Sequence, residues 1–288
     1  MTTTEPRAIT WIEGDWIEGN PPLLGPMTHA TWMASVVFDG ARSLARLAPD
    51  LDLHCARVIR SAEVMGLVAP VAADEIERLA WDGIEQFDEA AELYIRPLIY
   101  AEEGFVVAVP DSTRFILSVF EAPMPKGEGL KVCLSPYRRP APDAAPTEAK
   151  TACLYPNVAR ALREARGKGF DSAVVLDGLS NVAELATANL FMVKDGIVAT
   201  PMINGTFLNG ITRQRVIQLL RNDGLAVEER RITYPELQRA DEIFATGNYT
   251  KINPVIQLED RSLQRGPVAA RARTLYFEYA ETAGRKQI

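Results

Sequence analysis

The sequence predicts an α+β fold built from two domains. In residues 1–120, two helical runs lie among strand-like runs, which indicates a small domain with a mostly antiparallel sheet. The stretch Glu121-Ala-Pro-Met-Pro-Lys-Gly-Glu128 interrupts this pattern with prolines and a glycine, so we expect it to link the domains. Residues 129–288 alternate strands with helices and are expected to form the larger domain.

The composition argues against several classes of protein. With 288 residues, 47% of them hydrophobic, the chain can bury one large core or two modest ones. The formal net charge of -7 argues against nucleic acid and anionic membranes as partners. Cys55, Cys133 and Cys153 show no CxxC spacing, which indicates a reducing compartment. The sequence shows no signal-peptide pattern and no apolar run long enough to span a bilayer, so we expect a cytoplasmic protein.

The first half begins with short strands. Residues 11–17 read as a hairpin, with Gly14-Asp15 as the turn between two apolar runs. Val36, Val37 and Phe38 ahead of Asp39-Gly40 predict a second strand pair.

Two helices and three strands complete the first half. The spacing of apolar residues predicts helices over 53–65 and 71–87, and the first places His54, Arg57 and Ser61 on one face. Runs rich in β-branched and aromatic residues predict consecutive strands over 93–100, 105–109 and 114–120.

The second half alternates the two kinds of element. Apolar runs predict strands near 130–134, 173–176, 190–193, 197–199, 226–232 and 242–245. Lys194-Asp195-Gly196 is expected to turn the third of these strands into the fourth. Amphipathic spacing predicts helices over 150–166, 212–221 and 267–283, the first of them entered from a Pro/Ala-rich loop at 140–146.

Three short pieces between Lys150 and Arg213 carry candidate chemistry. Of the seven lysines, only Lys150 joins a loop to an apolar helical run, Glu184 stands just before a strand, and Gly210 begins a turn into a helix. Taken singly, each is typical of a solvated lysine, an exposed glutamate or an ordinary helix cap. Together they suit pyridoxal phosphate, which needs an amine for its aldehyde, a carboxylate for its ring nitrogen and a helix N-terminus for its phosphate.

A longer motif joins these pieces. The run Glu184-x-Ala186-x-x-Asn189-Leu190-Phe191, then Val198-x-Thr200, then Leu208-x-Gly210-Ile211-x-Arg213, resembles the signature of the class IV aminotransferases, which are the fold-type IV pyridoxal-phosphate enzymes. Further segments are similar to the family's: Val37-Phe38-Asp39-Gly40-x-Arg42, His54-x-x-Arg57-x-x-x-Ser61, Tyr94-Ile95-Arg96-Pro97 and Lys150-x-x-x-x-Tyr155. The resemblance covers the chain from Trp11 to about Pro254 and is nearest to the branched-chain amino-acid aminotransferases.

The resemblance implies a fold and a cofactor site. It implies a small α/β N-terminal domain, a larger α+β C-terminal domain, and pyridoxal 5'-phosphate in the cleft between them. Lys150 would be the catalytic lysine that bonds to the cofactor, Glu184 would face the ring nitrogen, and Tyr155 would lie beside the ring hydroxyl. The phosphate would be held by the residues matching the family's binding groups, namely Arg57, Gly210, Ile211, Thr212, Thr246, Gly247 and Asn248.

The resemblance also implies substrates and partners. Tyr94 and Arg96 would face the substrate carboxylates, while Phe38 and Met33 would receive the substrate side chain. The reaction would move an amino group from a branched-chain or similar apolar L-amino acid to 2-oxoglutarate. A metal, nucleic acid or membrane is not expected to take part, and a homodimer or larger homo-oligomer is expected because the family's sites use a loop from a second subunit.

Two departures from the branched-chain pattern leave the amino donor open. Met33 or Ala34 stands where that subgroup usually has a tyrosine, and Thr246-Gly247-Asn248 replaces a Ser/Thr-Gly-Thr turn. The alternatives are an (R)-selective amine transaminase, a D-amino-acid transaminase or aminodeoxychorismate lyase on the same fold. From another class, a non-catalytic binding protein remains an alternative, although Lys150, Glu184 and Arg57 argue against it.

Overall fold

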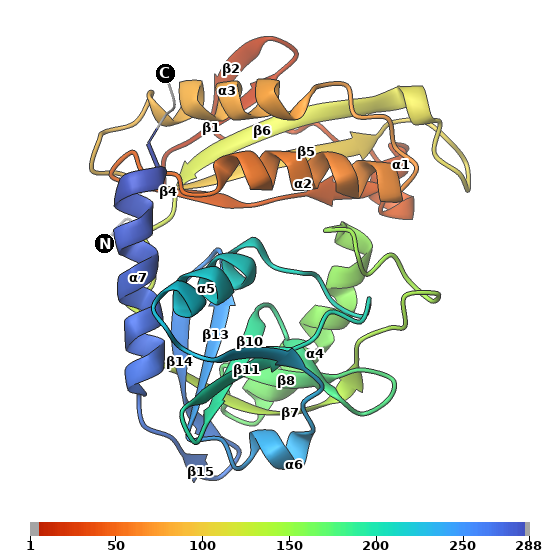
Figure 1. The fold of residues 1–288 in the computed structure, drawn as a ribbon. Coiled ribbons are helices and arrows are strands. Elements are labelled where there is room, and N and C mark those ends of the chain that lie inside the picture. The colour runs from red at the N-terminus through yellow and green to blue at the C-terminus, as the bar shows by residue number, and fades with distance from the viewer. Residues whose placement is uncertain (1–5, 286–288) are drawn as a thin grey trace. The chain divides into compact units, whose positions relative to one another are not determined.

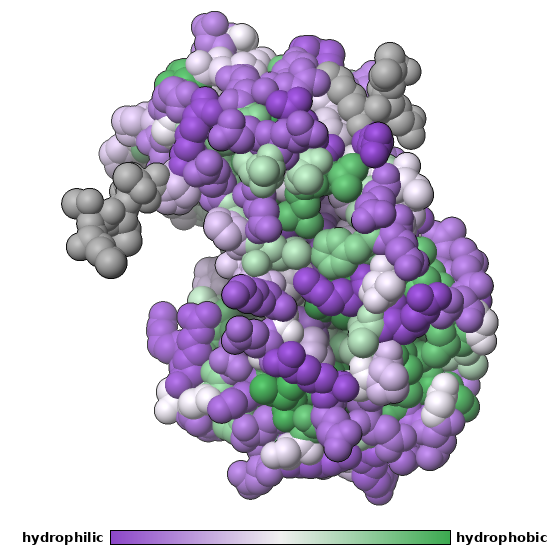
Figure 2. Space-filling model, turned by 90° about the vertical axis from the view of Figure 1, so that its left-hand side faces the viewer, coloured by the Kyte–Doolittle hydropathy of each residue, from purple (hydrophilic) through white to green (hydrophobic). Residues whose placement is uncertain are grey.

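The computed structural model describes residues 6–285, which pack as two compact units. Within the described range, the first unit holds residues 6–124, 149–153 and 279–285, and the second holds residues 125–148 and 154–278. None of the helices in this range has both the length and the apolar character needed to cross a membrane. The face shown in Figure 2 carries mainly hydrophilic side chains on each unit.

Two short segments far along the sequence belong to the first unit. Thr151 forms an antiparallel bridge with Val37, which ties residues 149–153 to that unit. The hydroxyl of Tyr279 donates to Asp50 at 2.8 Å, and the carbonyl of Gly284 accepts from the amide of Ala48 at 2.6 Å. A division at the expected linker, 121–128, would assign both of these segments to the second domain. The domain limits at 120 and 129 stay predictions.

The first unit is built on an antiparallel sheet. Among the described residues it has six strands in the order β2-β1-β6-β5-β3, with β4 also paired to β5. The strands are β1 (Ala8–Ile12), β2 (Asp15–Glu18), β3 (Val36–Phe38), β4 (Ala41–Leu44), β5 (Glu92–Ala101) and β6 (Thr113–Glu121). The hairpin turn falls at Glu13 and Gly14, whose φ angles of 49° and 107° suit a tight two-residue turn, rather than at Gly14-Asp15.

Two strand predictions in this unit were wrong. The strands β3 and β4 do not pair with each other, because each pairs with a different stretch of β5, Phe38 with Leu98 and Ala41 with Ile95. Residues 105–109 form no strand but an exposed loop before the short helix η1 (Pro110–Ser112). Their apolar sequence fits a strand, but their backbone pairs with no other strand of the described chain, since β5 and β6 pair directly with each other.

The helices of the first unit lie against this sheet. Helix α2 (Leu51–Val64) contacts β5, helix α3 (Ala73–Ile84) contacts β6, and the two helices contact each other (Figure 1). Their inward faces carry Val58, Ile76 and Leu79, which join one apolar core with the sheet residues Ile95 and Val119. A short helix, α1 (His29–Met33), precedes β3 and was not predicted.

The second unit has a mixed sheet. Among the described residues it has nine strands in the order β12-β11-β10-β13-β14-β7-β8-β9, with β15 paired to β14. The strands are β7 (Leu130–Arg138), β8 (Ser172–Leu176), β9 (Val182–Leu185), β10 (Asn189–Lys194), β11 (Ile197–Pro201), β12 (Val227–Arg230), β13 (Glu242–Gly247), β14 (Lys251–Leu258) and β15 (Arg261–Ser262). The pairs β11–β12, β14–β7 and β7–β8 are parallel, and the other pairs are antiparallel.

The remaining helices are η2 (Ala152–Leu154), α4 (Tyr155–Gly167), α5 (Ile211–Asn222), α6 (Tyr234–Leu237) and α7 (Pro267–Ala283). Helix α4 packs on β7 and β8, and α5 packs on β13 (Figure 1). Helix α4 begins at Tyr155 and not at Lys150, because Thr151 is extended and bridged to Val37. Glu184 precedes β10, as predicted, but it lies inside the short strand β9, which was not predicted.

Candidate active site

The predicted site residue Arg57 is held by a buried carboxylate, Asp39. The side chain of Asp39 has no exposed surface and accepts hydrogen bonds from Arg57 Nε at 2.6 Å, Arg57 Nη2 at 2.7 Å and His54 Nδ1 at 2.7 Å. Burial alone raises the pKa of Asp39, but the charges of Arg57 and His54 and their hydrogen bonds outweigh it, so this pKa lies far below its ordinary value. The pair fixes the orientation of the Arg57 guanidinium.

The helical spacing in α2 brings the predicted residues together. His54, Arg57 and Ser61 are all buried on one side of this helix, which confirms the predicted face. Ser61 Oγ donates to the carbonyl of Arg57 at 2.9 Å and accepts from the backbone N–H of Lys150 at 3.1 Å. The hydroxyl of Ser61 therefore links Lys150 to the helix that carries Arg57.

Lys150 is held by its backbone on both sides. Its N–H donates to Ser61, and its carbonyl accepts from the N–H of Phe38 at 3.1 Å. Its amino group, Nζ, lies 4.8 Å from the centre of the Phe38 ring. Thr151 Oγ1 donates to the carbonyl of Val36 at 2.9 Å, which fixes the next residue along β3. Lys150 thus stands on an extended segment packed on β3, where its amine contacts an aromatic face.

Tyr94 and Arg96 lie on the same side of β5, two residues apart. The rings of Tyr94 and Phe120 stack with centres 5.4 Å apart, and the Arg96 guanidinium lies 4.8 Å from the Phe120 ring. A Cβ at Gly40 would lie 2.1 Å from the hydroxyl of Tyr94, so only glycine allows this approach. The predicted substrate residue Met33 ends α1 and is 39% exposed.

In the second unit, Glu184 is buried between an arginine and an amide. Its Oε1 lies 3.4 Å from Arg139 Nε, which also donates to the carbonyl of Thr206 at 2.9 Å. Its Oε2 lies 3.5 Å from Asn189 Nδ2. Arg139 was not predicted from the sequence. A carboxylate buried in a strand needs a nearby cation, and this requirement could have pointed to an arginine.

Asn189 connects the sheet to the start of α5. Its Nδ2 donates to the carbonyl of Leu208 at 3.0 Å, and its Oδ1 accepts from the N–H of Gly210 at 3.1 Å. A Cβ at Gly210 would lie 2.1 Å from this oxygen, so the turn requires glycine. In the sheet, Asn189 pairs with Thr246, which places the start of α5 beside the end of β13. The motif contained Asn189, but its hydrogen bonds to Leu208 and Gly210 were not predicted.

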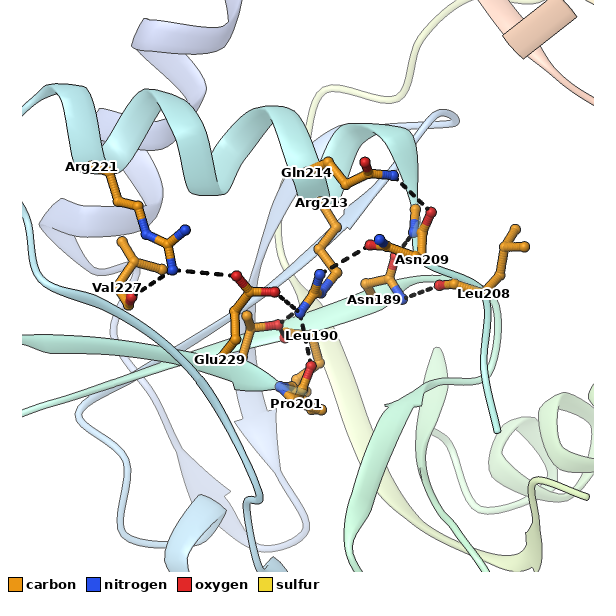
Figure 3. Close-up of polar contacts among 12 residues, drawn as sticks. Asn189, Leu190, Pro201, Leu208, Asn209, Arg213, Gln214, Arg221, Val227 and Glu229 are labelled. Carbon is orange, nitrogen blue, oxygen red and sulfur yellow. Dashed lines mark hydrogen bonds and ion pairs between the residues drawn. The ribbon is translucent and has the colours of Figure 1, made fainter. Parts of the chain in front are cut away.

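Arg213 anchors the same turn from the other side. Fully buried, it bonds to Asn209 Oδ1 at 3.0 Å, to the carbonyl of Pro201 at 2.8 Å and to Glu229 Oε2 at 3.1 Å (Figure 3). Arg221 bonds to the second oxygen of Glu229 at 3.3 Å. This network ties the first turn of α5 to β11 and β12, so the backbone N–H groups of Ile211 and Thr212 are held in place.

The groups near this turn fit a phosphate. The N-terminus of α5 presents backbone N–H groups with no partner in the helix, and Gly210 has no side chain with which to cap them. Among residues 6–285, Thr246 Oγ1 and Asn248 Nδ2 are buried and have no hydrogen-bond partner. Buried donors are seldom left without an acceptor, so this set favours an anionic ligand.

The structure thus gathers the predicted residues into two sets. The first unit holds Met33, Phe38, Arg57, Tyr94, Arg96 and Lys150, and the second holds Tyr155, Glu184, Gly210, Ile211, Thr212, Thr246, Gly247 and Asn248. Tyr155 is the first residue of α4 and is 38% exposed. Across the described chain, no three His, Cys, Asp or Glu side chains lie together as a metal site would require.

Comparison with known proteins identifies the family. Residues 36–258 match the family described as Amino-transferase class IV. The chain is 33% identical over 258 residues to a probable branched-chain-amino-acid aminotransferase of Rickettsia typhi, covering 88% of this chain and 89% of that protein.

Two solved structures are similar over nearly the whole length. An aminotransferase from Brucella abortus bound to the cofactor PLP has a TM-score of 0.94 and 47% identity, covering 96% of this chain and 99% of that one. A T.th. branched-chain amino acid aminotransferase complexed with N-(5'-phosphopyridoxyl)-L-glutamate has a TM-score of 0.88 and 29% identity, covering 96% and 95%. The chain therefore belongs to the class IV aminotransferases and is a pyridoxal-phosphate-dependent transaminase of fold type IV.

Proposed function

We propose that this transaminase moves the amino group of a branched-chain or similarly apolar L-amino acid to 2-oxoglutarate. The identity of the proposed amino donor is supported by the match to a probable branched-chain enzyme over 88% of the chain. The acceptor is supported by the T.th. enzyme, whose complex contains a pyridoxylated L-glutamate. Glutamate is the amino acid that 2-oxoglutarate becomes when it receives an amino group.

We propose that Lys150 is the catalytic base as well as the residue bonded to the cofactor. Bound pyridoxal phosphate supplies an electron sink for the carbanion that forms when the substrate loses its Cα proton. Once the substrate amine has displaced it from the cofactor, the amine of Lys150 would take that proton from Cα of the substrate and hold it for return. Its fixed backbone and its contact with Phe38 support this role, because a base must be held within reach of the proton that it moves.

Glu184 is proposed to keep the proton on the ring nitrogen. A negative charge close to this nitrogen favours its protonated form, which makes the ring a stronger acceptor of electrons. Arg139 and Asn189 hold the two carboxylate oxygens, so the side chain is oriented before the cofactor binds. Tyr155 is proposed to lie beside the ring hydroxyl.

Several of the groups described above are proposed to bind the phosphate. Arg57 offers a planar guanidinium that Asp39 orients, and the Gly210–Thr212 turn offers backbone N–H groups. The end of β13 and the residue after it add Thr246 Oγ1 and Asn248 Nδ2, two donors that have no partner among the described residues. Tyr94, Arg96, Phe38 and Met33 are proposed to contact the substrate.

The protein is also proposed to be a homodimer. In the first unit, Phe105, Val106 and Val107 are 77%, 68% and 79% exposed, and the Phe105 ring lies 5.3 Å from that of Trp32. Contiguous apolar side chains on a surface mark an interaction site more often than isolated ones do. A second copy of the chain is the proposed partner of this surface, because the family's sites are expected to use a loop from a neighbouring subunit.

A panel of amino donors with 2-oxoglutarate tests the proposed reaction. Leucine, D-alanine and (R)-1-phenylethylamine are supplied separately, and the glutamate formed and its chirality are measured. We expect L-glutamate from leucine at a rate well above the other two donors. Faster turnover of D-alanine or of the amine would contradict the proposal and assign a different specificity to the same fold.

A further inference from the structure

A second lysine lies next to the proposed phosphate turn. Lys251 begins β14, and its side chain is 1% exposed although it carries an amine. Its Nζ donates to Asn248 Oδ1 at 2.6 Å and lies 5.4 Å from the centre of the Tyr276 ring. Its backbone φ of 60° lies in the left-handed region, which residues other than glycine rarely adopt. A buried amine on a disfavoured backbone indicates a position with a function.

The partner of Lys251 explains what that function can be. An asparagine amide has two ends, a carbonyl oxygen that repels an anion and an NH2 group that binds one. A hydroxyl at the same position rotates freely and can always present its proton. Asn248 can serve a phosphate only if its oxygen is turned away, and a donor on that oxygen sets this orientation.

We propose that Lys251 is a positioning residue for the cofactor phosphate. By donating to Oδ1 of Asn248, it keeps Nδ2 as the end of the amide that is available to an anion. Nδ2 is buried and has no partner among the described residues, as the proposal requires. The inference rests on the proposed role of the Thr246–Asn248 turn and adds a residue that the family resemblance did not point to.

The test uses the full-length apo protein and two ligands that differ only in the phosphate. Binding of pyridoxal phosphate and of pyridoxal is followed by quenching of tryptophan fluorescence. We expect Lys251→Met to weaken pyridoxal phosphate about tenfold or more, the size of one hydrogen bond to a charged group, and pyridoxal by less than about twofold. Lys131→Met, at an exposed lysine, is the matched control and should change neither affinity.

A second background separates positioning from general damage. Asn248→Thr replaces the amide with a hydroxyl that needs no orienting donor. We expect the double variant Asn248→Thr/Lys251→Met to bind pyridoxal phosphate within about threefold of Asn248→Thr alone, because the coupled interaction is already gone. Equal losses in the two backgrounds, or equal losses for the two ligands, would overturn the proposal.

A further variant covers the case in which Lys251→Met does not fold. Asn248→Asp keeps an acceptor for Lys251 but has no N–H, so the apo melting temperature should be maintained while pyridoxal phosphate binding falls more than about tenfold. Wild-type affinity in this variant would overturn the inference and leave the proposed transaminase intact. Failure of the wild type to bind pyridoxal phosphate would remove both.

Discussion

Arg57 and Asp39 form a two-point ion pair, with Nε 2.6 Å from Oδ2 and Nη2 2.7 Å from Oδ1. Asp39 follows β3 and Arg57 stands on α2, so the pair ties this helix to the sheet of the first unit. It also fixes the plane of a guanidinium that we propose to hold phosphate. One ion pair therefore contributes to both the stability of the unit and the geometry of the site.

The first prediction concerns acid stability. Because the folded-state pKa of Asp39 is lowered, its contribution to stability is fully present above the pKa of an unfolded aspartate, about 3.9, and is lost as the pH falls below that value. Asp39→Asn should therefore be less stable than wild type at neutral pH, by roughly 3–5 kcal/mol for a buried charge left without its partner. Urea unfolding from pH 7 down to pH 3 measures both effects.

The difference between the two proteins should shrink as the pH falls. Asp82→Asn is the matched control, since Asp82 forms an ion pair with Arg78 in which the two side chains are 36% and 55% exposed. That variant should change stability by less than about 1 kcal/mol. A constant difference between Asp39→Asn and wild type at every pH would contradict the lowered pKa.

The second prediction compares two arginines of one helix. Arg57→Ala should weaken pyridoxal phosphate binding by a few kcal/mol, as expected when one partner of a buried charge pair is truncated. Arg60→Ala, an exposed position on the same helix, should leave the affinity unchanged. Titration of the apo proteins with cofactor measures both affinities. Equal losses in the two variants would mean that Arg57 does not contact the phosphate.

The third prediction identifies the lysine that is bonded to the cofactor. Borohydride reduction of the holoenzyme followed by peptide mapping should place the pyridoxyl group on the peptide that contains Lys150. Lys150→Ala should still bind the cofactor through its phosphate but should not turn over. A label on Lys131, Lys168 or the buried Lys251 would reject the assignment.

The fourth prediction tests the proposed dimer. Phe105→Asp should weaken self-association about tenfold or more, since it removes an apolar side chain from the proposed interface. Leu179→Asp is the control because Leu179 is 79% exposed, close to the 77% of Phe105, but belongs to the second unit. Sedimentation velocity over a range of concentrations measures both variants. Unchanged association of the Phe105 variant would place the interface elsewhere.

Local sequence signals predicted many elements of the structure. Helix α7 has its expected bounds, Pro267–Ala283, because its amphipathic spacing alone identifies it. Residues 105–109 were misread because β-propensity describes a side chain that suits a sheet but does not supply a neighbouring strand. Strand β14 was missed because Asn253 and Pro254 interrupt its apolar pattern.

The candidate site was likewise predicted only in part. The motifs contained Lys150, Glu184 and Arg57, and also Asp39 and Asn189, but they did not show which side chain holds which, and they did not contain Arg139. Arg139 lies 45 residues before Glu184, and Asp39 lies 18 residues before Arg57. Such partners are set by how strands and helices pack, which a helical or alternating period does not encode. Lys251 and Asn248 are close in the sequence, yet their contact depends on the left-handed backbone of Lys251, which no local sequence pattern predicts.

The last prediction concerns Glu184, whose carboxylate lies between Arg139 and Asn189. Glutamine has nearly the same shape as glutamate and no charge, so Glu184→Gln should keep the fold and bind the cofactor nearly as well as wild type. Without the negative charge, the ring nitrogen is less readily protonated and proton removal from the substrate Cα by Lys150 becomes harder. We expect the first half-reaction to slow about a hundredfold or more, a loss typical of removing one electrostatic partner at a reacting group.

Stopped-flow absorbance of the holoenzyme mixed with leucine measures that step, because only the first half-reaction occurs without an acceptor. Glu228→Gln, at an exposed glutamate of β12, is the control and should react at the wild-type rate. A second variant, Arg139→Met, should slow the same step less than Glu184→Gln does, since it disturbs the orientation of the carboxylate but leaves its charge. If Glu184→Gln reacted at nearly the wild-type rate, Glu184 would not be the partner of the ring nitrogen, and its burial with Arg139 would be structural only.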